Sequence, residues 1–578
     1  MKDRNNLKKI LFFLNKTIVS SGRLTALFVL IALVWLRVED PELLKLIRAK
    51  TFDFYQQMKP RSTQEGTSPV VILDIDEKSL EQIGQWPWRR TIMAEIVEKL
   101  HKAQSAAVGF DFVMPEKDGT SLPELSKSLK DLPEELRKSM SAQPSNDQVL
   151  ADAIKKHGRI IVGQAPFTGE KEYTGKKLRS SFAVRGGDPI EWTEKNKTII
   201  RNIPEIEEAA KGRGVFSVSQ ERVDGIVRRV SLVLSSGNQL FPSLSLETLK
   251  VAYGARSIVM LVNPETGIDK IALQIIRPKR QNITVPTDKR GRIWVYFKPN
   301  SEFKKQYISA VDLLENKVNP RKLNGKIILI GSSAEGIKDL RSTPLDRVLP
   351  GVEVHANLLE NILLGQQLTR PAEAVGAELL AAIALGLLMI IFAPMLGAQI
   401  TLLLFISISG GLLFYSWTAF AERLELYDAG YPMLVALIIY VFLTYTSYAK
   451  EEKERKEVRS AFGQYISPDL VKKLENDPTQ LSLGGEMRDM TFMFSDIRGF
   501  TSISELFDAE GLTNLINRFL TPITNVILNN KGTIDKYMGD CVMAFWNAPL
   551  ADKDHAVGAC ISALEMITEL EALNNKLE

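Results

Sequence analysis

The stretch MTFMFSDIRGFT (residues 490–501) decides the fold of the C-terminal part of this 578-residue chain. Its apolar first half predicts a strand that ends in Asp496, and a turn follows at Gly499. Apolar residues at helical spacing then run from Leu512 to Ile527 and predict a long helix. Residues 533–546 predict two short strands around a tight turn, with Asp540 at its tip. The sequence therefore predicts a strand, a turn, a helix and a hairpin.

Two segments here, FSDIRGFT (residues 494–501) and KYMGD (residues 536–540), resemble the two metal-binding motifs of class III adenylate and guanylate cyclases in order and spacing. The resemblance implies a ferredoxin-like α+β catalytic domain that forms a homodimer with shared active sites. It also implies that Asp496 and Asp540 are catalytic and that these two residues, with Ile497, bind two Mg²⁺ or Mn²⁺ ions.

The chemistry of nucleotide cyclisation suits these residue types. The 3′-hydroxyl of a nucleoside triphosphate attacks its own α-phosphate while pyrophosphate leaves, so negative charge accumulates on the phosphoryl oxygens. Two hard cations held by carboxylates activate the hydroxyl and neutralise the triphosphate. The backbone N–H groups of Ile497, Gly499, Phe500 and Thr501 enter a helix and are suited to bind the β- and γ-phosphates.

Lys536 indicates the base. In cyclases of this class the residue four positions before the second aspartate is lysine in adenylate cyclases and commonly glutamate in guanylate cyclases. A lysine donor suits adenine N1, whereas guanine N1 carries a hydrogen and prefers a carboxylate. We therefore expect conversion of ATP to cyclic AMP and pyrophosphate, with a guanylate cyclase as the rival. Taken singly, Asp496 also suits a helix cap, Asp540 a turn and Lys536 a solvated charge.

The sequence predicts one more helix after Trp546, over residues 554–575, with an apolar face formed by Leu564, Ile567, Leu570 and Leu573. The second base-reading residue of these cyclases and their transition-state asparagine and arginine have no counterpart before Glu578. We therefore expect residues 488–578 to form the first half of the catalytic domain and the 578-residue chain to be inactive by itself. The non-catalytic alternative is a sensor and dimerisation protein with a cyclase remnant.

Four apolar runs predict four transmembrane helices. The first, residues 24–36, follows a basic stretch and has no cleavage site, so it predicts an uncleaved anchor rather than a cleaved peptide or a core helix. Residues 379–421 carry no charge and are divided by Pro394 and Gly397 into two segments, and residues 429–449 form the last run. Flanking basic residues place both termini in the cytoplasm. We expect a multi-pass protein of the bacterial inner membrane.

Between the first two runs, strand-like and helical patterns alternate and predict a mixed α/β domain outside the cytoplasm. Its motifs resemble the second type of CHASE sensor domain, whose ligand the sequence leaves unknown; they are residues 76–80, 84–89, 108–111, 224–229, 343–345 and 350–356. Strand ends bind ligands in α/β sheets, so we expect five side chains to line a pocket or to pack as a corner: Asp74, Asp76, Trp86, Trp88 and Asp111. His355 is expected in the core.

The predicted parts are residues 1–37 (N-terminus and anchor), 38–372 (sensor), 375–449 (three membrane helices), 450–487 (signalling helix and linker) and 488–578 (partial cyclase domain). The charged run 450–459 continues the last membrane helix, and residues 462–471 resemble the segment that precedes many class III catalytic domains. The chain has 73 basic and 69 acidic residues without a concentrated basic patch, so we expect no nucleic-acid partner. Its two cysteines, Cys541 and Cys560, allow no disulfide in the sensor.

Overall fold

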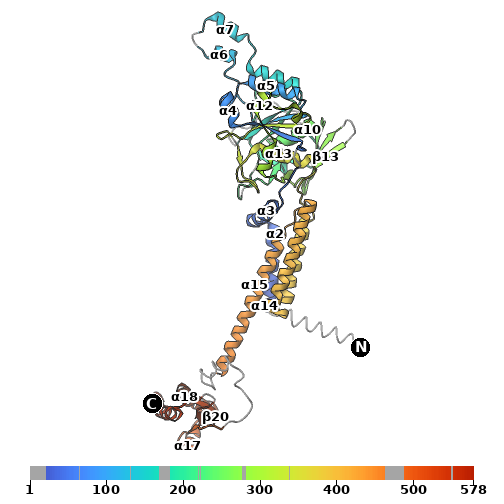
Figure 1. The fold of residues 1–578 in the computed structure, drawn as a ribbon. Helices are drawn as coiled ribbons and strands as arrows, with labels where there is room; N and C mark the ends of the chain where they lie inside the picture. Colours follow the sequence, from blue (N-terminus) through green and yellow to red (C-terminus); the bar gives the residue numbers. More distant parts are fainter. Residues whose placement is uncertain are drawn as a thin grey trace, which may run out of the picture. The chain divides into compact units, whose positions relative to one another are not determined.

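The chain divides into two compact units, Met1–Val441 and Phe442–Glu578. The structure is a computed structural model, and it describes residues 21–577 except 64–65, 130–131, 168–181, 219, 222, 276–280, 338, 463–486 and 549–550 (Figure 1). The basic N-terminal stretch and most of the predicted linker, including the cyclase-like segment after Phe462, lie outside the described residues.

A seven-stranded sheet forms the centre of the first unit (Figure 1). Its strand order is β15-β1-β16-β2-β3-β6, with β7 also paired to β3, and every pair is parallel except β3 with β6. All six residues of β1 are buried, as expected for a parallel strand covered by helices on both faces. The strands are β1 Val70–Ile75, β2 Ala107–Phe110, β3 Ile160–Phe167, β6 Thr198–Ile200, β7 Gly212–Val215, β15 Tyr307–Ser309 and β16 Ile327–Ser332.

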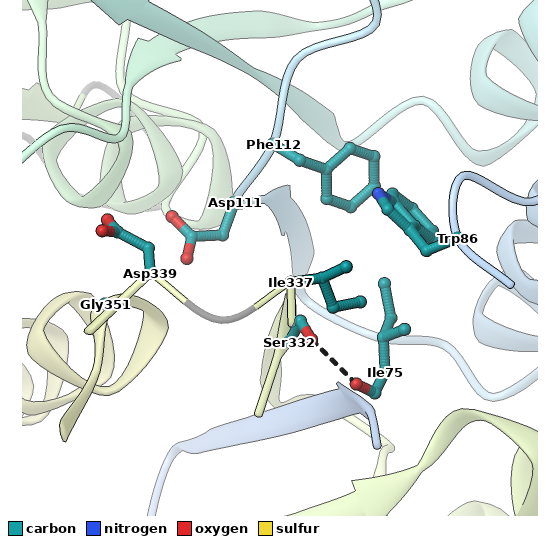
Figure 2. A pocket seen from close by; sticks show the side chains of 8 residues that line it. All are labelled: Ile75, Trp86, Asp111, Phe112, Ser332, Ile337, Asp339 and Gly351. Atoms are coloured by element: carbon teal, nitrogen blue, oxygen red, sulfur yellow. Dashed lines mark hydrogen bonds between the residues drawn. The ribbon is translucent and has the colours of Figure 1, made fainter. Parts of the chain in front are cut away.

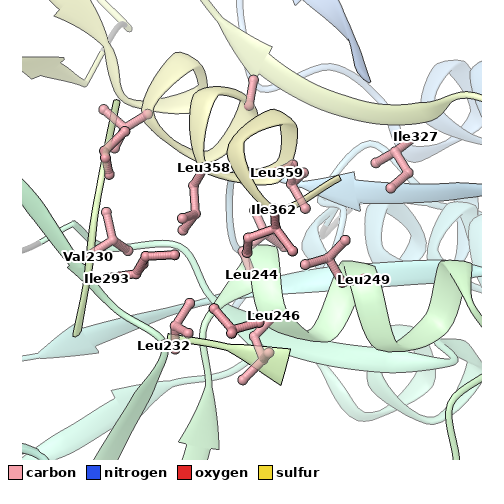
Figure 3. Close-up of a cluster of buried hydrophobic side chains, with 14 of the residues drawn as sticks. Val230, Leu232, Leu244, Leu246, Leu249, Ile293, Ile327, Leu358, Leu359 and Ile362 are labelled. Atoms are coloured by element: carbon pink, nitrogen blue, oxygen red, sulfur yellow. The ribbon is translucent and has the colours of Figure 1, made fainter. Parts of the chain in front are cut away.

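Helices cover both faces of this sheet. Successive side chains of β1 point to opposite faces, so their contacts show which helices cover each face. Val70 and Ile72 join one core cluster with α10 (Leu244–Ala252) and α13 (Gly351–Leu363), which Figure 3 shows facing each other. Leu73 and Ile75 join the other cluster with α4 (Glu77–Ile83), α5 (Arg90–Lys102), α8 (Asn146–His157), α9 (Pro204–Ala209) and α12 (Ala310–Leu314). The predicted mixed α/β domain is confirmed.

Smaller elements surround this centre. A four-stranded sheet has the order β13-β12-β11-β4, a three-stranded sheet the order β10-β9-β5, and β14-β8 and β17-β18 form two-stranded sheets. Their bounds are β4 Phe182–Gly186, β5 Glu194–Asn196, β8 Arg229–Ser231, β9 Val233–Ser236, β10 Gln239–Pro242, β11 Ser257–Asn263, β12 Gly267–Ile275, β13 Gln281–Val285, β14 Arg292–Trp294, β17 Leu340–Arg341 and β18 Leu349–Pro350. The short helices are α6 Leu122–Ser128, α7 Glu134–Ser141 and α11 Asn300–Phe303.

Two helices in the described residues are long and apolar enough to cross a membrane, Ala374–Arg423 (α14) and residues 430–457 of α15 (Gly430–Phe462). Gly397, with φ 76° and ψ 166°, interrupts α14. Both ends of α14 lie together, because the backbone of Thr369 exchanges hydrogen bonds with Leu424 and Leu426. The chain therefore reverses within α14, but the predicted count of four membrane-crossing helices is not confirmed. The first apolar run forms α2 (Ser21–Glu39).

The second unit contains a three-stranded antiparallel sheet of order β19-β21-β20. Its core includes the fully buried Trp546, and a Cβ at Gly532 would lie 2.7 Å from the Trp546 ring, so this position requires glycine. The elements are β19 Thr491–Ser495, α17 Phe500–Ser504, α18 Ala509–Asn529, β20 Thr533–Met538, β21 Cys541–Trp546 and α19 His555–Leu577.

The predicted apolar face of α19 is only partly correct. Leu573 packs against the core together with the buried Ala559 and Met566, whereas Leu564 and Ile567 are exposed within the described part of the chain. One side of the sheet is exposed as well, and it carries Phe492 and Phe494.

Candidate active site

The register of the sheet brings the two predicted aspartates together. Because β19 runs antiparallel to β21, Ser495 at the end of β19 pairs with Val542 near the start of β21. Asp496 follows the first of these strands and Asp540 precedes the second, so both side chains lie at one edge. The Ile497 N–H donates to Asp496 Oδ1 at 3.1 Å and to Asp540 Oδ2 at 3.2 Å.

The turn that holds Asp540 follows directly from the local sequence. Met538 pairs with Cys541, so Gly539 and Asp540 form a two-residue hairpin loop. Gly539 has φ 67°, a conformation that glycine adopts without steric penalty. The predicted hairpin with Asp540 at its tip is confirmed.

The Asp540 carboxyl lies close enough to Asp496 to change the pKa of Asp496. Asp496 is exposed, yet its pKa is raised because it shares a hydrogen bond with Asp540 and because the two charges repel each other. Two like charges at one exposed edge form a place where a bound cation would relieve the repulsion.

The donor set at this edge fits a hard cation. Two carboxylates and the carbonyl of Ile497 supply oxygen atoms, which Mg²⁺ and Mn²⁺ prefer. The Ile497 carbonyl also accepts the Phe500 N–H at 3.2 Å, which leaves its second lone pair for a ligand. Among the described residues no third His, Cys, Asp or Glu joins a metal-binding group, so water or substrate phosphate would complete the shell.

The long helix predicted over Leu512–Ile527 is confirmed as α18, but the loop after Asp496 first enters a separate short helix, α17. Gly499, with φ 75°, precedes the five-residue α17, and the long α18 starts only at Ala509. Asp508 causes this second start, because its side chain accepts the Gly511 N–H as an N-cap. The Ile497 N–H already donates to the two aspartates, and the Phe500 N–H donates to the Ile497 carbonyl. Thr501 lies in the first turn of α17.

Lys536 lies on the same hairpin as Asp540. It pairs with Met543 across the sheet, directly after a register shift between Ile534 and Lys536. Its Nζ is 3.3 Å from Asp535 Oδ2, and its side chain is 58% exposed, so the ammonium group reaches solvent. Asp496, Ile497, Asp540 and Lys536 thus come from one sheet and its adjoining loop.

The predicted strand-end residues of the first unit separate into two groups. Asp76 caps α4 through the Ser79 N–H, Trp88 is buried in the core with its Nε1–H bonded to the Gly84 carbonyl, and His355 is fully buried beside Ser245. Asp74 is buried and bonds to Ser333. Only two of the expected residues, Trp86 and Asp111, line a cavity.

Comparison with known protein families explains this architecture. The CHASE2 domain matches residues 25–393, well over half of the chain. The chain belongs to the CHASE2 family. Its C-terminal residues 485–578 match the adenylate and guanylate cyclase catalytic domain, so the CHASE2 chain also carries a class III cyclase domain.

Individual relatives match parts of this CHASE2 protein. Adenylate cyclase 1 of Rhizobium meliloti is 36% identical over 118 residues, which are 20% of this chain and 17% of the relative. The uncharacterized protein Rv1319c of Mycobacterium tuberculosis is 33% identical over 97 residues, 17% of this chain and 18% of that protein. The chain thus spans less than a fifth of the length of these curated relatives.

Two solved structures also match part of the chain. The adenylyl cyclase CyaB of P. aeruginosa is 41% identical over 15% of this chain and 46% of that chain, with a TM-score of 0.15. The guanylyl cyclase Cya2 is 35% identical over 16% of this chain and 48% of that chain, with a TM-score of 0.16. The chain spans about half of each solved protein.

Sequence reasoning missed six of the eight residues that line the CHASE2 cavity, among them Phe112 and Asp339. Phe112 directly follows Asp111, so its position near the end of β2 could have identified it. Asp339 lies in a loop after β16, and the sequence around it gives no indication that it lies near the end of β2. Only the parallel pairing of β16 with β2 brings these residues together.

Proposed function

We propose that the protein is a membrane-bound adenylate cyclase controlled by its CHASE2 sensor domain, and that it converts ATP to cyclic AMP and pyrophosphate. One observation supports this proposal above the others: Asp496 and Asp540 lie at one edge of a sheet and share the Ile497 N–H. A cyclase remnant without catalytic function has no need of this pairing.

The chain's own residues divide the work. Asp496, Asp540 and the Ile497 carbonyl would hold two Mg²⁺ or Mn²⁺ ions, which when bound lower the pKa of the attacking hydroxyl and neutralise the triphosphate. The loop from Ile497 to Thr501 would orient the phosphates through the backbone N–H groups of Gly499 and Thr501, since those of Ile497 and Phe500 already have acceptors. The loop directly follows β19, the strand that positions Asp496. The same strand would therefore position both the residues that contact the phosphates and those that bind the cations.

Lys536 would select the base by donating to adenine N1. Its side chain is exposed and extends from the strand that leads to Asp540, so the nucleotide base would lie beside the hairpin. A guanylate cyclase is the second candidate, because the matching catalytic-domain family includes both adenylate and guanylate cyclases. A carboxylate at position 536 would favour that candidate, and lysine does not.

We propose that α2, both halves of α14, and α15 form four membrane spans, with residues 38–372 outside the inner membrane and the cyclase domain in the cytoplasm as a homodimer. Packing of α2 supports the fourth span. A Cβ at Gly386 of α14 would lie 2.5 Å from Leu30 of α2, and the Tyr431 hydroxyl of α15 donates to the Leu33 carbonyl. Helix α2 therefore packs against both apolar helices.

Charge pairs connect the body of the sensor to the helix that follows α2. Helix α3 (Glu42–Met58) continues from α2, and its Asp53 accepts two hydrogen bonds at 2.7 Å from Arg228. Arg228 also bonds Asp224, which is part of the CHASE-like motif at residues 224–229. A movement in this part of the sensor would reach α2 through a short, buried path.

The activity is tested on the full-length protein encoded by the gene, in detergent with Mn²⁺, by measuring kcat/KM for ATP and for GTP. We expect cyclic AMP as the product and a preference for ATP. A preference for GTP would identify a guanylate cyclase, and the absence of both products would support the non-catalytic alternative.

The topology is tested by labelling single cysteines in intact cells, since the chain has only Cys541 and Cys560 to replace first. A membrane-impermeant maleimide should label Glu134→Cys in the sensor without lysis and Glu569→Cys only after lysis. Labelling of both sites in intact cells would contradict the proposed orientation.

A further inference from the structure

A small cavity opens at the carboxyl edge of the central sheet of the CHASE2 domain (Figure 2). Ile75 ends β1, Asp111 directly follows β2 and Ser332 ends β16, so three adjacent parallel strands point at it. The cavity has a volume of about 60 Å³. With about 10–15 Å³ for each water molecule, it holds roughly four to six non-hydrogen atoms. This edge of a parallel sheet is where α/β folds bind ligands.

Two kinds of side chain line the cavity, and Figure 2 shows them on different sides. Asp111 and Asp339 supply carboxylates on one side. Trp86 and Phe112 supply aromatic rings on the other, with ring centroids 4.9 Å apart and planes at 75°. Ile337 lies between the two sides. An anionic wall opposite an aromatic wall suits a ligand that is both cationic and partly apolar.

The two carboxylates differ in their partners. Asp339 accepts a hydrogen bond at 2.6 Å from the Arg341 guanidinium. The Asp111 carboxyl has no hydrogen-bond or ion-pair partner among the residues that the structure describes, and it faces the cavity. Its pKa is raised well above its usual value because it is desolvated; Asp339 raises it further and Arg341 lowers it. A cation in the cavity would give the Asp111 carboxylate a direct partner.

We propose that this cavity binds a small organic ammonium compound, with the ammonium group on Asp111 and the carbon atoms against Trp86 and Phe112. A divalent metal ion fits less well. Such an ion takes six or more oxygen ligands, whereas among the lining residues only Asp111, Ser332 and Asp339 carry side-chain oxygen atoms. Within the described chain, no group of three metal-ligating side chains forms at this site or elsewhere. This inference concerns the sensor and does not depend on cyclase activity.

The test measures thermal unfolding of the full-length protein in detergent at pH 8, with methylammonium, ethylammonium or propylammonium chloride as probes. Sodium chloride at equal ionic strength and the alcohol of equal size are the controls. We expect at least one amine to raise the unfolding temperature saturably, while its alcohol does not. The proposal is overturned if all three amines behave like sodium chloride, or if Mg²⁺ stabilises the protein and the amines do not.

Three variants locate the effect. Asp111→Asn should weaken amine binding at least tenfold and should still fold, because the carboxyl forms no hydrogen bond that the change would break. Trp86→Leu keeps the charge, removes the aromatic face and should also weaken binding at least tenfold. Asp152→Asn, on an exposed part of α8, should bind the amine like the wild type. Equal binding by Asp111→Asn and wild type would overturn the proposal.

Discussion

Both units of the protein place carboxyl groups at strand ends, but in opposite surroundings. In the cyclase domain, Asp496 and Asp540 lie at an open edge of an antiparallel sheet, and the pKa of Asp496 is raised by its hydrogen bond with Asp540. In the CHASE2 domain, Asp74 and Asp111 lie at the covered edge of a parallel sheet, and burial raises the pKa of both, that of Asp74 to about 6.

This comparison shows two ways in which a carboxyl group can be kept available for a ligand. An exposed acidic pair is balanced by ions from solution, so it suits soluble metal ions and their nucleotide. A buried acid is neutral or paired, so it responds to a ligand that fits and brings its own charge. Charge pairs show the same contrast: Arg228 and Asp53 are buried, whereas Lys138 and Glu134 form an exposed pair.

The largest expected effect is on the exposed acidic pair. Asp496→Ala and Asp540→Ala should each lower the cyclase rate by about 10³-fold, because one carboxylate cannot hold two cations against the triphosphate. The steady-state rate at saturating Mn²⁺ is the measurement, with the exposed Glu569→Ala as the control. A variant that retains more than about a tenth of the wild-type rate would show that its aspartate is not a metal ligand.

The buried charge pair of the sensor gives the next largest effect. Arg228→Met leaves Asp53 buried without its main partner and should destabilise the protein by about 3–5 kcal/mol. Lys138→Met removes one partner of an exposed pair and should change stability by less than about 1 kcal/mol. Chemical denaturation followed by tryptophan fluorescence compares the two. Similar effects of both changes would remove the contrast between the buried and the exposed pair.

Burial of Asp74 predicts a pH dependence with a definite sign. Its pKa is about 6 in the folded chain and near 4 when unfolded, so folding favours the neutral form. The stability it contributes is present below about pH 4 and is lost as the pH rises through 6, a loss of roughly 2–3 kcal/mol.

Asp74→Asn should remove this part of the pH dependence, because an amide still bonds to Ser333 and does not ionise. Unfolding temperatures of wild type and variant between pH 4 and 8 are the measurement. Glu353, whose pKa burial raises to about 8, continues the decline at higher pH in both proteins. Parallel curves for the two proteins would contradict the assignment to Asp74.

The smallest predicted effect concerns base selection. Lys536→Glu places an acceptor opposite adenine N1 and should lower kcat/KM for ATP at least about tenfold, with a smaller loss for GTP. Lys531→Glu changes the same charge elsewhere in the domain, where Lys531 lies 4.0 Å from Asp552, and should leave the ATP to GTP ratio unchanged. An unchanged ratio in Lys536→Glu would place Lys536 outside the base pocket.

The geometry of the candidate cyclase site was predictable because its parts are local. Residues 533–546 form one hairpin, and the strand before Asp496 pairs directly with it. The spacing of the motifs and the turn residues therefore indicate most of the geometry of the site. The separate short helix α17 was not predicted. Its separation from α18 depends on whether Asp508 caps a new helix or lies within a longer one.

The CHASE2 cavity was predictable only in part. The positions of strand ends correctly indicated Trp86 and Asp111 as cavity residues, but they also suggested Asp76 and Trp88. The Asp76 side chain instead caps a helix, and Trp88 is buried in the core. Asp339 joins the cavity through the parallel pairing of β16 with β2, a long-range contact that the local sequence does not encode.

The central claim is that Asp496 and Asp540 together hold the catalytic cations. Electron paramagnetic resonance of Mn²⁺, titrated into the full-length protein with an ATP analogue that lacks the 3′-hydroxyl, measures the number of bound ions directly. The account predicts two Mn²⁺ ions per active site in the wild type, and weaker binding with fewer than two ions in Asp496→Asn and in Asp540→Asn. Two ions bound equally tightly in either variant would contradict it.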